Sequence, residues 1–167
     1  FHPDESVSVE PILCTAETLV RLQDHIQVFY TGRIRSASEL LSEQTRKTAG
    51  DRRTRETLVK MVALAGDLKA ELERNNLDAF GEILHENWEL KKSLVEGISD
   101  GEIDGWYESA REAGAAGGKL LGAGRGGFMM VFAPPERHAA IAHALPGLRE
   151  VPFRFDANGS QIIFYRP

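Results

Sequence analysis

The feature that most constrains this chain is a glycine-rich stretch in its last third. Residues 117–132 read GGKLLGAGRGGFMMVF, in which six glycines stand among two apolar runs. Glycine loses more backbone entropy on folding than any other residue, so it is unfavourable inside a helix or a strand. The apolar residues on both sides are expected to be buried. The stretch therefore predicts a loop between two buried elements, at a place where the backbone must stay bare.

The glycines of this loop match the dinucleotide-binding pattern G-x-G-x-x-G in letters only. Gly122, Gly124 and Gly127 have the required spacing. That pattern, however, binds a pyrophosphate through the N-terminus of a helix that follows it. Here the apolar segment Phe128–Phe132 follows, with two prolines after it, which is typical of a buried strand. The P-loop pattern is excluded as well, because no Gly-Lys-Ser or Gly-Lys-Thr ends the loop.

We therefore expect the glycine loop to join two adjacent antiparallel strands, Lys119–Leu121 and Phe128–Phe132, with Gly122–Gly127 exposed at one end of the sheet. Such a loop has three physical uses. It can make a tight bend in a crowded sheet, present a concave row of backbone N–H groups, or let another segment or a ligand approach closely. The glycines by themselves leave these three uses open.

The rest of the chain alternates strand and helix signals. Strands are predicted at residues 7–13, 25–30, 151–155 and 161–165, the last two joined by an Asn158-Gly159 hairpin turn. Helices are predicted at 16–23, from a capping box at Ser36, at 58–72, at 80–95, from a capping box at Ser99, and after Pro134-Pro135. This order predicts an α+β sandwich, in which an antiparallel sheet carries helices on one face.

Composition limits the possible functions. A length of 167 residues suits one domain, and a net charge of −5 with a pI near 5.6 argues against a nucleic-acid surface. Cys14 is the single cysteine, which excludes an internal disulfide and suits the reducing cytoplasm. No apolar run reaches the roughly 20 residues of a membrane span.

Two small patterns concern possible ligand groups. His85, Glu86 and Glu89 have HExxE spacing on a predicted helix surface, but no second histidine completes a zinc pair, so no metal site and no catalytic residue is assigned. Arg33 and Arg35 follow a predicted strand end, where a guanidinium fork beside a cleft can bind a sugar phosphate. These two arginines are candidate substrate ligands.

The glycine loop also carries a family resemblance. Lys-x-x-Gly-Ala-Gly-x-Gly-Gly followed by an apolar strand resembles the third conserved motif of the GHMP kinases (galacto-, homoserine, mevalonate and phosphomevalonate kinases). Three further segments resemble the heptose-phosphate kinase branch of that family: Phe29–Gly32 with Arg35-Ser36, Leu84–Trp88 with Lys91-Lys92, and Val151–Phe155. Arg125 departs from the motif, in which glycine or a small or acidic residue is usual. Its guanidinium either reaches the phosphates or lies in solvent.

The resemblance implies that residues 1–167 are a GHMP kinase C-terminal domain, a ferredoxin-like sandwich with an inserted helical layer. It also implies transfer of a phosphoryl group from ATP, with Mg²⁺, to a sugar phosphate, in this branch heptose 7-phosphate at its anomeric hydroxyl. The family's phosphate-binding loop and its N-terminal catalytic acid are found nowhere in this sequence. We expect both in an N-terminal ATP-binding half, and we expect this chain alone to be inactive.

The resemblance further implies which residues border the ligands. The nucleotide phosphates would lie near the glycine loop, formed by Gly122, Ala123, Gly124, Arg125, Gly126 and Gly127. Lys119 would lie near the sugar phosphate, for which Arg33 and Arg35 are already candidates from their position after the strand end. The expected partners are that small molecule and the N-terminal half of the same protein, with no nucleic acid and no membrane. The competing interpretation is a stand-alone ferredoxin-like module that binds a small ligand without catalysis.

Overall fold

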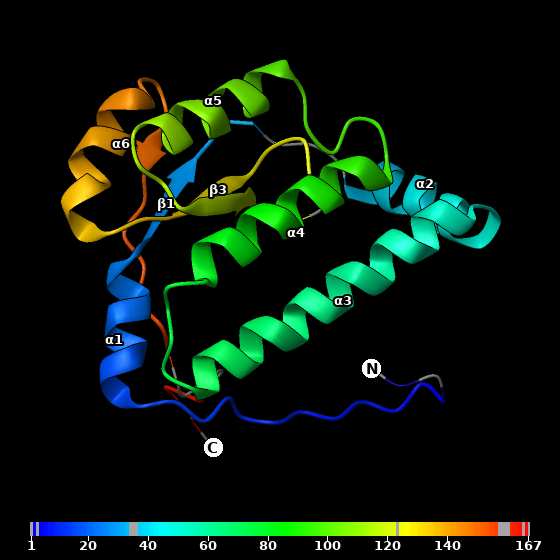
Figure 1. Cartoon of the computed structure of the whole chain (residues 1–167), viewed down its shortest axis with the longest axis horizontal. Coiled ribbons are helices and arrows are strands. Elements are labelled where there is room, and N and C mark those ends of the chain that lie inside the picture. The colour runs from blue at the N-terminus through cyan, green and yellow to red at the C-terminus, as the bar shows by residue number, and fades with distance from the viewer. Residues whose placement is uncertain are drawn as a thin grey trace.

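An antiparallel sheet forms the centre of the molecule, and helices surround it (Figure 1). The computed structural model describes residues 2, 4–33, 37–122, 124–156, 161–164 and 166. The strands are β1 (Ile26–Tyr30), β2 (Gly117–Leu120), β3 (Phe128–Phe132) and β4 (Arg149–Glu150), in the spatial order β2-β3-β1-β4. Each neighbouring pair of strands is antiparallel.

The helices lie before, between and after these strands. They are α1 (Ala16–Asp24), α2 (Ala37–Gly50), α3 (Arg52–Glu73), α4 (Phe80–Leu94), α5 (Gly101–Glu112), the 3-10 turn η1 (Pro135–Arg137) and α6 (His138–Ala144). Helices α2 to α5 are inserted between β1 and β2, and α6 joins β3 to β4. This chain order, with β1 and β3 in the middle of the sheet, is the ferredoxin-like arrangement. The predicted α+β class is confirmed.

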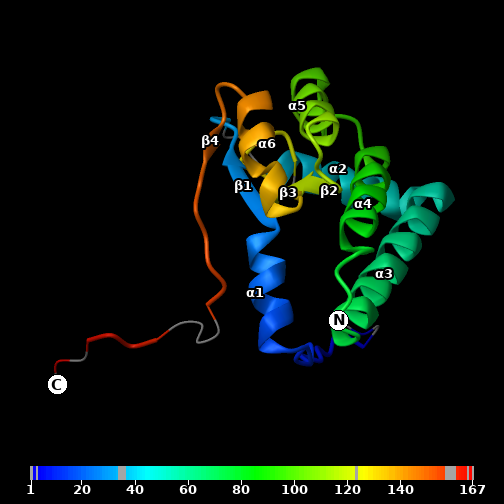
Figure 2. The same ribbon diagram turned by 60° about the vertical axis from the view of Figure 1, so that its left-hand side comes forward.

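Helices pack on both faces of the sheet, although the sequence predicted helices on one face. Phe29 and Met129 lie opposite each other in register, on the face that packs against α4, α5 and α6. Met130 and Phe132 point to the other face, because side chains alternate along a strand. There they contact a second cluster, to which α1, α3 and α4 contribute Leu22, Leu72 and Phe80. The long helix α3 runs alongside α4 (Figures 1 and 2).

Helix α4 covers the edge strand β2 because small residues stand at the contact. A Cβ on Gly117 would overlap the carbonyl oxygen of Gly81, and a Cβ on Gly81 would overlap Ala116. The contact protects a sheet edge that would otherwise expose unpaired backbone groups. Trp88 of α4 is fully buried, as its position in an apolar stripe predicted.

The predicted strand at residues 7–13 is wrong. This segment is irregular and passes beside α3 (Figure 1). It is held there by an ion pair between Glu10 and Lys69 at 2.8 Å and by a 2.7 Å hydrogen bond from the Thr15 backbone N–H to Asn75 Oδ1. Val9 is 90% exposed. The alternating pattern predicted a half-buried strand, but no described strand lies beside this segment to pair with it.

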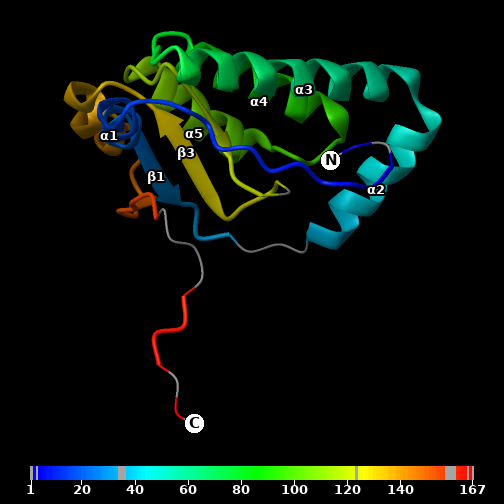
Figure 3. The same cartoon turned by 90° about the horizontal axis from the view of Figure 1, so that it is seen from below.

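Two further predictions near element ends need correction. Residues 151–155 and 161–164 form no strand; the strand β4 comes just before them, and the segment runs away from the sheet (Figures 2 and 3). The Asn158-Gly159 turn and Tyr165 lie outside the described residues, as does the predicted cap at Ser36. Helix α5 is capped by Asp100, which accepts the Ile103 N–H at 3.1 Å, and not by Ser99.

Candidate functional site

The glycine loop joins two paired strands, as predicted. Leu120 lies opposite Met129 in the register of β2 and β3, and the Leu121 N–H donates to the Phe128 carbonyl at 2.8 Å. No helix begins within residues 124–129, so the dinucleotide-binding interpretation stays excluded. The described loop residues are Gly122 and residues 124–127, whereas Ala123 lies outside the described part. The expected exposure holds for Gly122 but not for Gly126, which is buried.

The middle of the loop is wedged between two backbone segments of the same chain. An ideal Cβ on Gly124 would stand 2.8 Å from the Ile98 carbonyl oxygen, and one on Gly126 would stand 2.7 Å from the Arg33 carbonyl oxygen. The same two carbonyls accept hydrogen bonds from loop N–H groups, from Arg125 at 3.0 Å and from Gly127 at 2.9 Å. Close approach of the chain's own backbone therefore explains why these two positions are glycine.

Arg125 folds back onto the joint between α4 and α5. Its Nε donates to the Gly97 carbonyl at 2.7 Å, and a Cβ on Gly97 would overlap its guanidinium group. The residue itself has a positive φ of 60°. The half-buried side chain thus lies along the α4–α5 joint instead of extending freely into solvent. Its assignment to the nucleotide phosphates stays a prediction.

Arg33 connects the end of β1 to the start of α5. Its Nη1 and Nη2 atoms donate to the two carboxylate oxygens of Asp100 at 3.0 and 2.6 Å, and Nη1 also donates to Glu102 at 3.2 Å. Hydrogen bonding to this guanidinium lowers the pKa of Asp100 to about 2. Arg33 therefore holds α5 in place while its carbonyl anchors the glycine loop. Its role as a substrate ligand stays a prediction, and Arg35 lies outside the described residues.

Three backbone N–H groups of the loop have no acceptor among the described residues. The loop N–H groups that bond to a described carbonyl belong to Leu121, Arg125 and Gly127. Those of Gly122, Gly124 and Gly126 bond to no acceptor within the described part of the chain. Glycine-rich backbone with such N–H groups is a common setting for anion binding.

Two half-buried lysines lie beside the loop. The Lys119 ammonium on β2 donates to Asn87 Oδ1 of α4 at 3.4 Å, and the Lys91 ammonium, in the last turn of α4, donates to the Gly122 carbonyl at 2.5 Å. Burial and the Lys119 charge lower the pKa of Lys91 to about 8, and burial lowers the pKa of Lys119. The sequence singled out Lys119 as a site residue. It quoted Lys91 only as part of the resemblance, and the approach of α4 to β2 is what brings the two together.

His85 lies inside the contact between α4 and α5, and not on the helix surface as the sequence predicted. Its Nδ1 is 2.8 Å from the Tyr107 hydroxyl, and the two rings are stacked with centroids 5.9 Å apart. Burial raises the pKa of Tyr107 to about 12. Within the described ranges, no group of three or more His, Cys, Asp or Glu side chains is placed to hold a metal ion.

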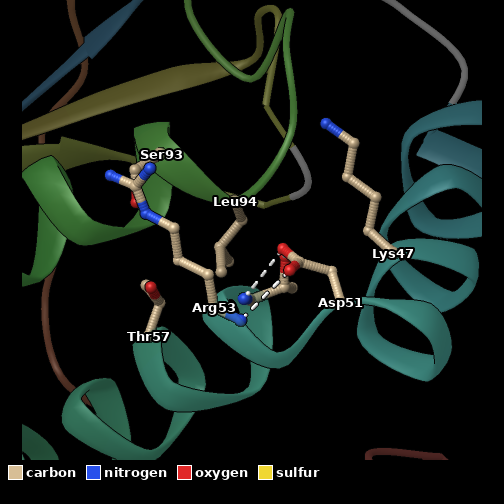
Figure 4. Close-up of a pocket in the computed structure, with 7 residues that line it drawn as sticks. Lys47, Asp51, Arg53, Thr57, Ser93 and Leu94 are labelled. Carbon is tan, nitrogen blue, oxygen red and sulfur yellow. Dashed lines mark hydrogen bonds between the residues drawn. The ribbon is translucent and has the colours of Figure 1, made fainter.

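A polar cavity of about 410 Å³ lies at the corner between α2 and α3, facing the C-terminal end of α4 (Figure 4). Lys47, Arg53, Thr57 and Ser93 line it. The hydrogen-bonding capacity of the Asp51 carboxylate is used within the chain, because it accepts the backbone N–H groups of Arg53 and Thr54 at the start of α3. The cavity is thus built around a helix cap.

A family match and two similar proteins indicate the same family of kinases. Residues 68–147 match the family described as GHMP kinases C terminal. D-glycero-alpha-D-manno-heptose 7-phosphate kinase of Campylobacter jejuni is 28% identical over 145 residues, which are 87% of this chain and 42% of that protein. Mevalonate kinase of Pyrococcus abyssi is 31% identical over 144 residues, covering 82% of this chain and 42% of that protein. The chain thus spans about two fifths of the length of these relatives.

Solved structures show the same fold. L. major mevalonate kinase, crystallised with R-mevalonate, superposes with a TM-score of 0.67 at 19% identity, over 75% of this chain and 40% of that one. In the part of the chain that the structure describes, no helix is long and apolar enough to cross a membrane. The ferredoxin-like topology, the glycine loop between β2 and β3 and the family match over residues 68–147 agree. The chain carries a GHMP kinase C-terminal domain.

Proposed function

We propose that the protein containing this chain is an ATP-dependent sugar kinase that phosphorylates heptose 7-phosphate at its anomeric hydroxyl. The support is a relative named as a D-glycero-alpha-D-manno-heptose 7-phosphate kinase, which matches 87% of this chain, together with the heptose-branch segments of the sequence. We further propose that residues 1–167 form one domain of that protein and that it works in the cytoplasm, which suits a chain with a single cysteine.

The observation that carries the proposal is the arrangement around the glycine loop. The loop is fixed to the chain's own backbone at Ile98 and Arg33, and beside it stand two ammonium groups and three N–H groups without a described acceptor. Phosphoryl transfer depends mainly on positioning the reactants and on stabilising negative charge with preorganised donors. This end of the sheet offers both a rigid wall and positive charge.

The remaining catalytic parts belong, in this proposal, to an N-terminal half of the same protein. That half would hold ATP and Mg²⁺ through the family's phosphate-binding loop, and it would contribute the catalytic acid. Mg²⁺ supplies charge neutralisation on the transferred phosphoryl group when it is bound. The domain described here would contribute the glycine-loop wall and the part of the sugar pocket that Lys119 borders.

The test is a coupled assay of ADP release by the full-length protein with ATP and Mg²⁺. Heptose 7-phosphate should support turnover, and ³¹P NMR of the product should show a new phosphate on the anomeric carbon. Mevalonate, the ligand named for a structural neighbour, is the matched comparison substrate. Turnover with mevalonate but not with heptose 7-phosphate would refute the substrate assignment.

The same assay separates the kinase from the stand-alone binding module. We expect residues 1–167 alone to release no ADP above a buffer blank, because the proposed nucleotide site is incomplete without the other half. A full-length protein that binds heptose 7-phosphate but never turns it over would favour the binding module instead.

A further inference from the structure

Lys91 and Lys119 form an unusual pair of cations. Both side chains are half-buried, and within the described residues neither ammonium group has a carboxylate within 4.0 Å. The next residue along α4 shows the ordinary arrangement. Lys92 forms ion pairs with Glu89 at 2.8 Å and with Asp104 at 3.5 Å. Lys91 and Lys119 therefore lack, among the described residues, the carboxylate partners that Lys92 has.

The pair costs folding free energy, because burial and like charge both disfavour the charged forms. The lowered pKa of Lys91 and of Lys119 expresses that cost. The C-terminal dipole of α4 compensates part of it at Lys91, which also stabilises the Gly122 carbonyl. Lys119 has no such compensation, since its described polar contact is a 3.4 Å bond to the neutral Asn87 amide.

The surroundings of the pair suit an anion. Lys119 lies on β2 opposite Met130, so its side chain projects from the sheet face that also carries Tyr30 and Phe128. Phe128 is 40% exposed on that face. An ideal Cβ on Gly122 meets no described heavy atom within 4 Å, so there is space directly beside the Lys91 contact.

We propose that Lys91 and Lys119 bind a phosphate monoester, and that in the kinase this is the phosphate that the sugar substrate already carries. The assignment to the substrate rests on the proposed function. A phosphate dianion matches the two ammonium charges, and lysine binds phosphate as a compact point charge. The nucleotide offers the same chemistry from a second source, so the experiments below separate the two.

The direct experiment titrates the 167-residue chain with inorganic phosphate at pH 7 and constant ionic strength. NMR signals of the lysine ε-CH₂ groups report where the phosphate binds. We expect saturable shifts at Lys91 and Lys119, and a loss of affinity of about tenfold or more in K91Q and in K119Q. K92Q is the matched control, because it removes one lysine charge from the same helical turn, and its affinity should stay within about twofold.

Two results would overturn the site. One is a wild-type chain whose Lys91 and Lys119 signals do not respond to phosphate; the other is an equal loss of affinity in K92Q, which would mean general charge attraction. Far-UV circular dichroism checks that each variant is folded. K91R restores the charge, so recovery of binding in K91R separates a charge effect from a packing effect even where K91Q is destabilised.

The second experiment assigns the phosphate in the full-length protein. K91Q and K119Q should raise KM for the sugar phosphate about tenfold or more with a smaller change in kcat, and leave KM for ATP unchanged. A rise in KM for ATP alone would assign the site to the nucleotide and refute our assignment. Phosphate binding by the chain, combined with a full-length protein inactive on every sugar phosphate, would refute the proposed function and leave the anion site standing.

Discussion

Replacing Gly124 by alanine tests whether the chain's own backbone demands glycine in this loop. Gly124 has a φ of 124°, and a Cβ there would stand 2.8, 3.0 and 3.3 Å from the backbone O, Cα and C atoms of Ile98. None of these atoms can move without shifting the α4–α5 joint. Gly122 is the matched control, with a φ of 84° and no described atom within 4 Å of an added Cβ.

The free energies of unfolding of G124A and G122A should differ by the cost of the clash. A left-handed backbone conformation costs an L-residue about 1–2 kcal/mol, and this cost destabilises both variants. Overpacking against backbone adds about 1–3 kcal/mol in G124A alone. We therefore expect G124A to be less stable than G122A by about 2 kcal/mol. For a chain of this size that difference lowers Tm by about 4–8 °C.

Urea unfolding followed by circular dichroism measures both free energies, and thermal unfolding checks their order. Equal stability of G124A and G122A would refute the inference that close contact with the Ile98 backbone requires glycine at position 124. In the full-length protein the same variants report on catalysis. If the loop is only a tight bend, the folded fraction of G124A keeps normal kinetics. If the loop also positions phosphate, kcat/KM falls by about tenfold, which corresponds to roughly 1.4 kcal/mol.

Three further outcomes follow from other parts of the structure. G66A and G105A should each stabilise the chain by about 0.5–1 kcal/mol in urea unfolding, because both glycines are helical and an added Cβ meets nothing within 4 Å. Asp100 has its pKa lowered to about 2 by Arg33, so the wild type should lose stability as pH falls from about 4 to 2, and D100N should lack that loss. The pKa of Lys91 is lowered to about 8, so protonation destabilises the fold below that pH; stability should rise between about pH 8 and 10.5, and this rise should be absent in K91Q.

The loop between β2 and β3 could be predicted from sequence because its evidence is local. Apolar runs, glycines and prolines within a short window determine which residues can be buried and which must bend. The predicted strands at 7–13 and 151–155 failed for the opposite reason. An alternating pattern states which face would be buried, but a strand also needs a partner, and partners come from distant parts of the chain.

The proposed lysine pair could be predicted only in part, for a similar reason. Lys119 stands within the glycine motif, which singles it out, whereas Lys91 lies 28 positions earlier, on a helix. Its place beside Lys119 depends on Gly81 and Gly117, which let α4 lie directly on β2. Such a helix–strand contact leaves a weak trace in sequence, a lone glycine in the first turn of an otherwise ordinary helix. Arg33 shows the converse: its type suggested a phosphate ligand, and its described partners are carboxylates.

The glycines of the loop are therefore not equivalent, although the motif writes them with one letter. Gly124 and Gly126 contact backbone of the same chain, so their identity is explained without any ligand. Among the described residues, Gly122 contacts nothing that a Cβ would disturb and its N–H has no acceptor, while its carbonyl accepts a hydrogen bond from Lys91. A positive φ explains why glycine is favoured there, but not why the space beside it is open. Because that open space adjoins the Lys91 ammonium group, the proposed phosphate site predicts that Gly122 is the loop position nearest to the bound phosphate.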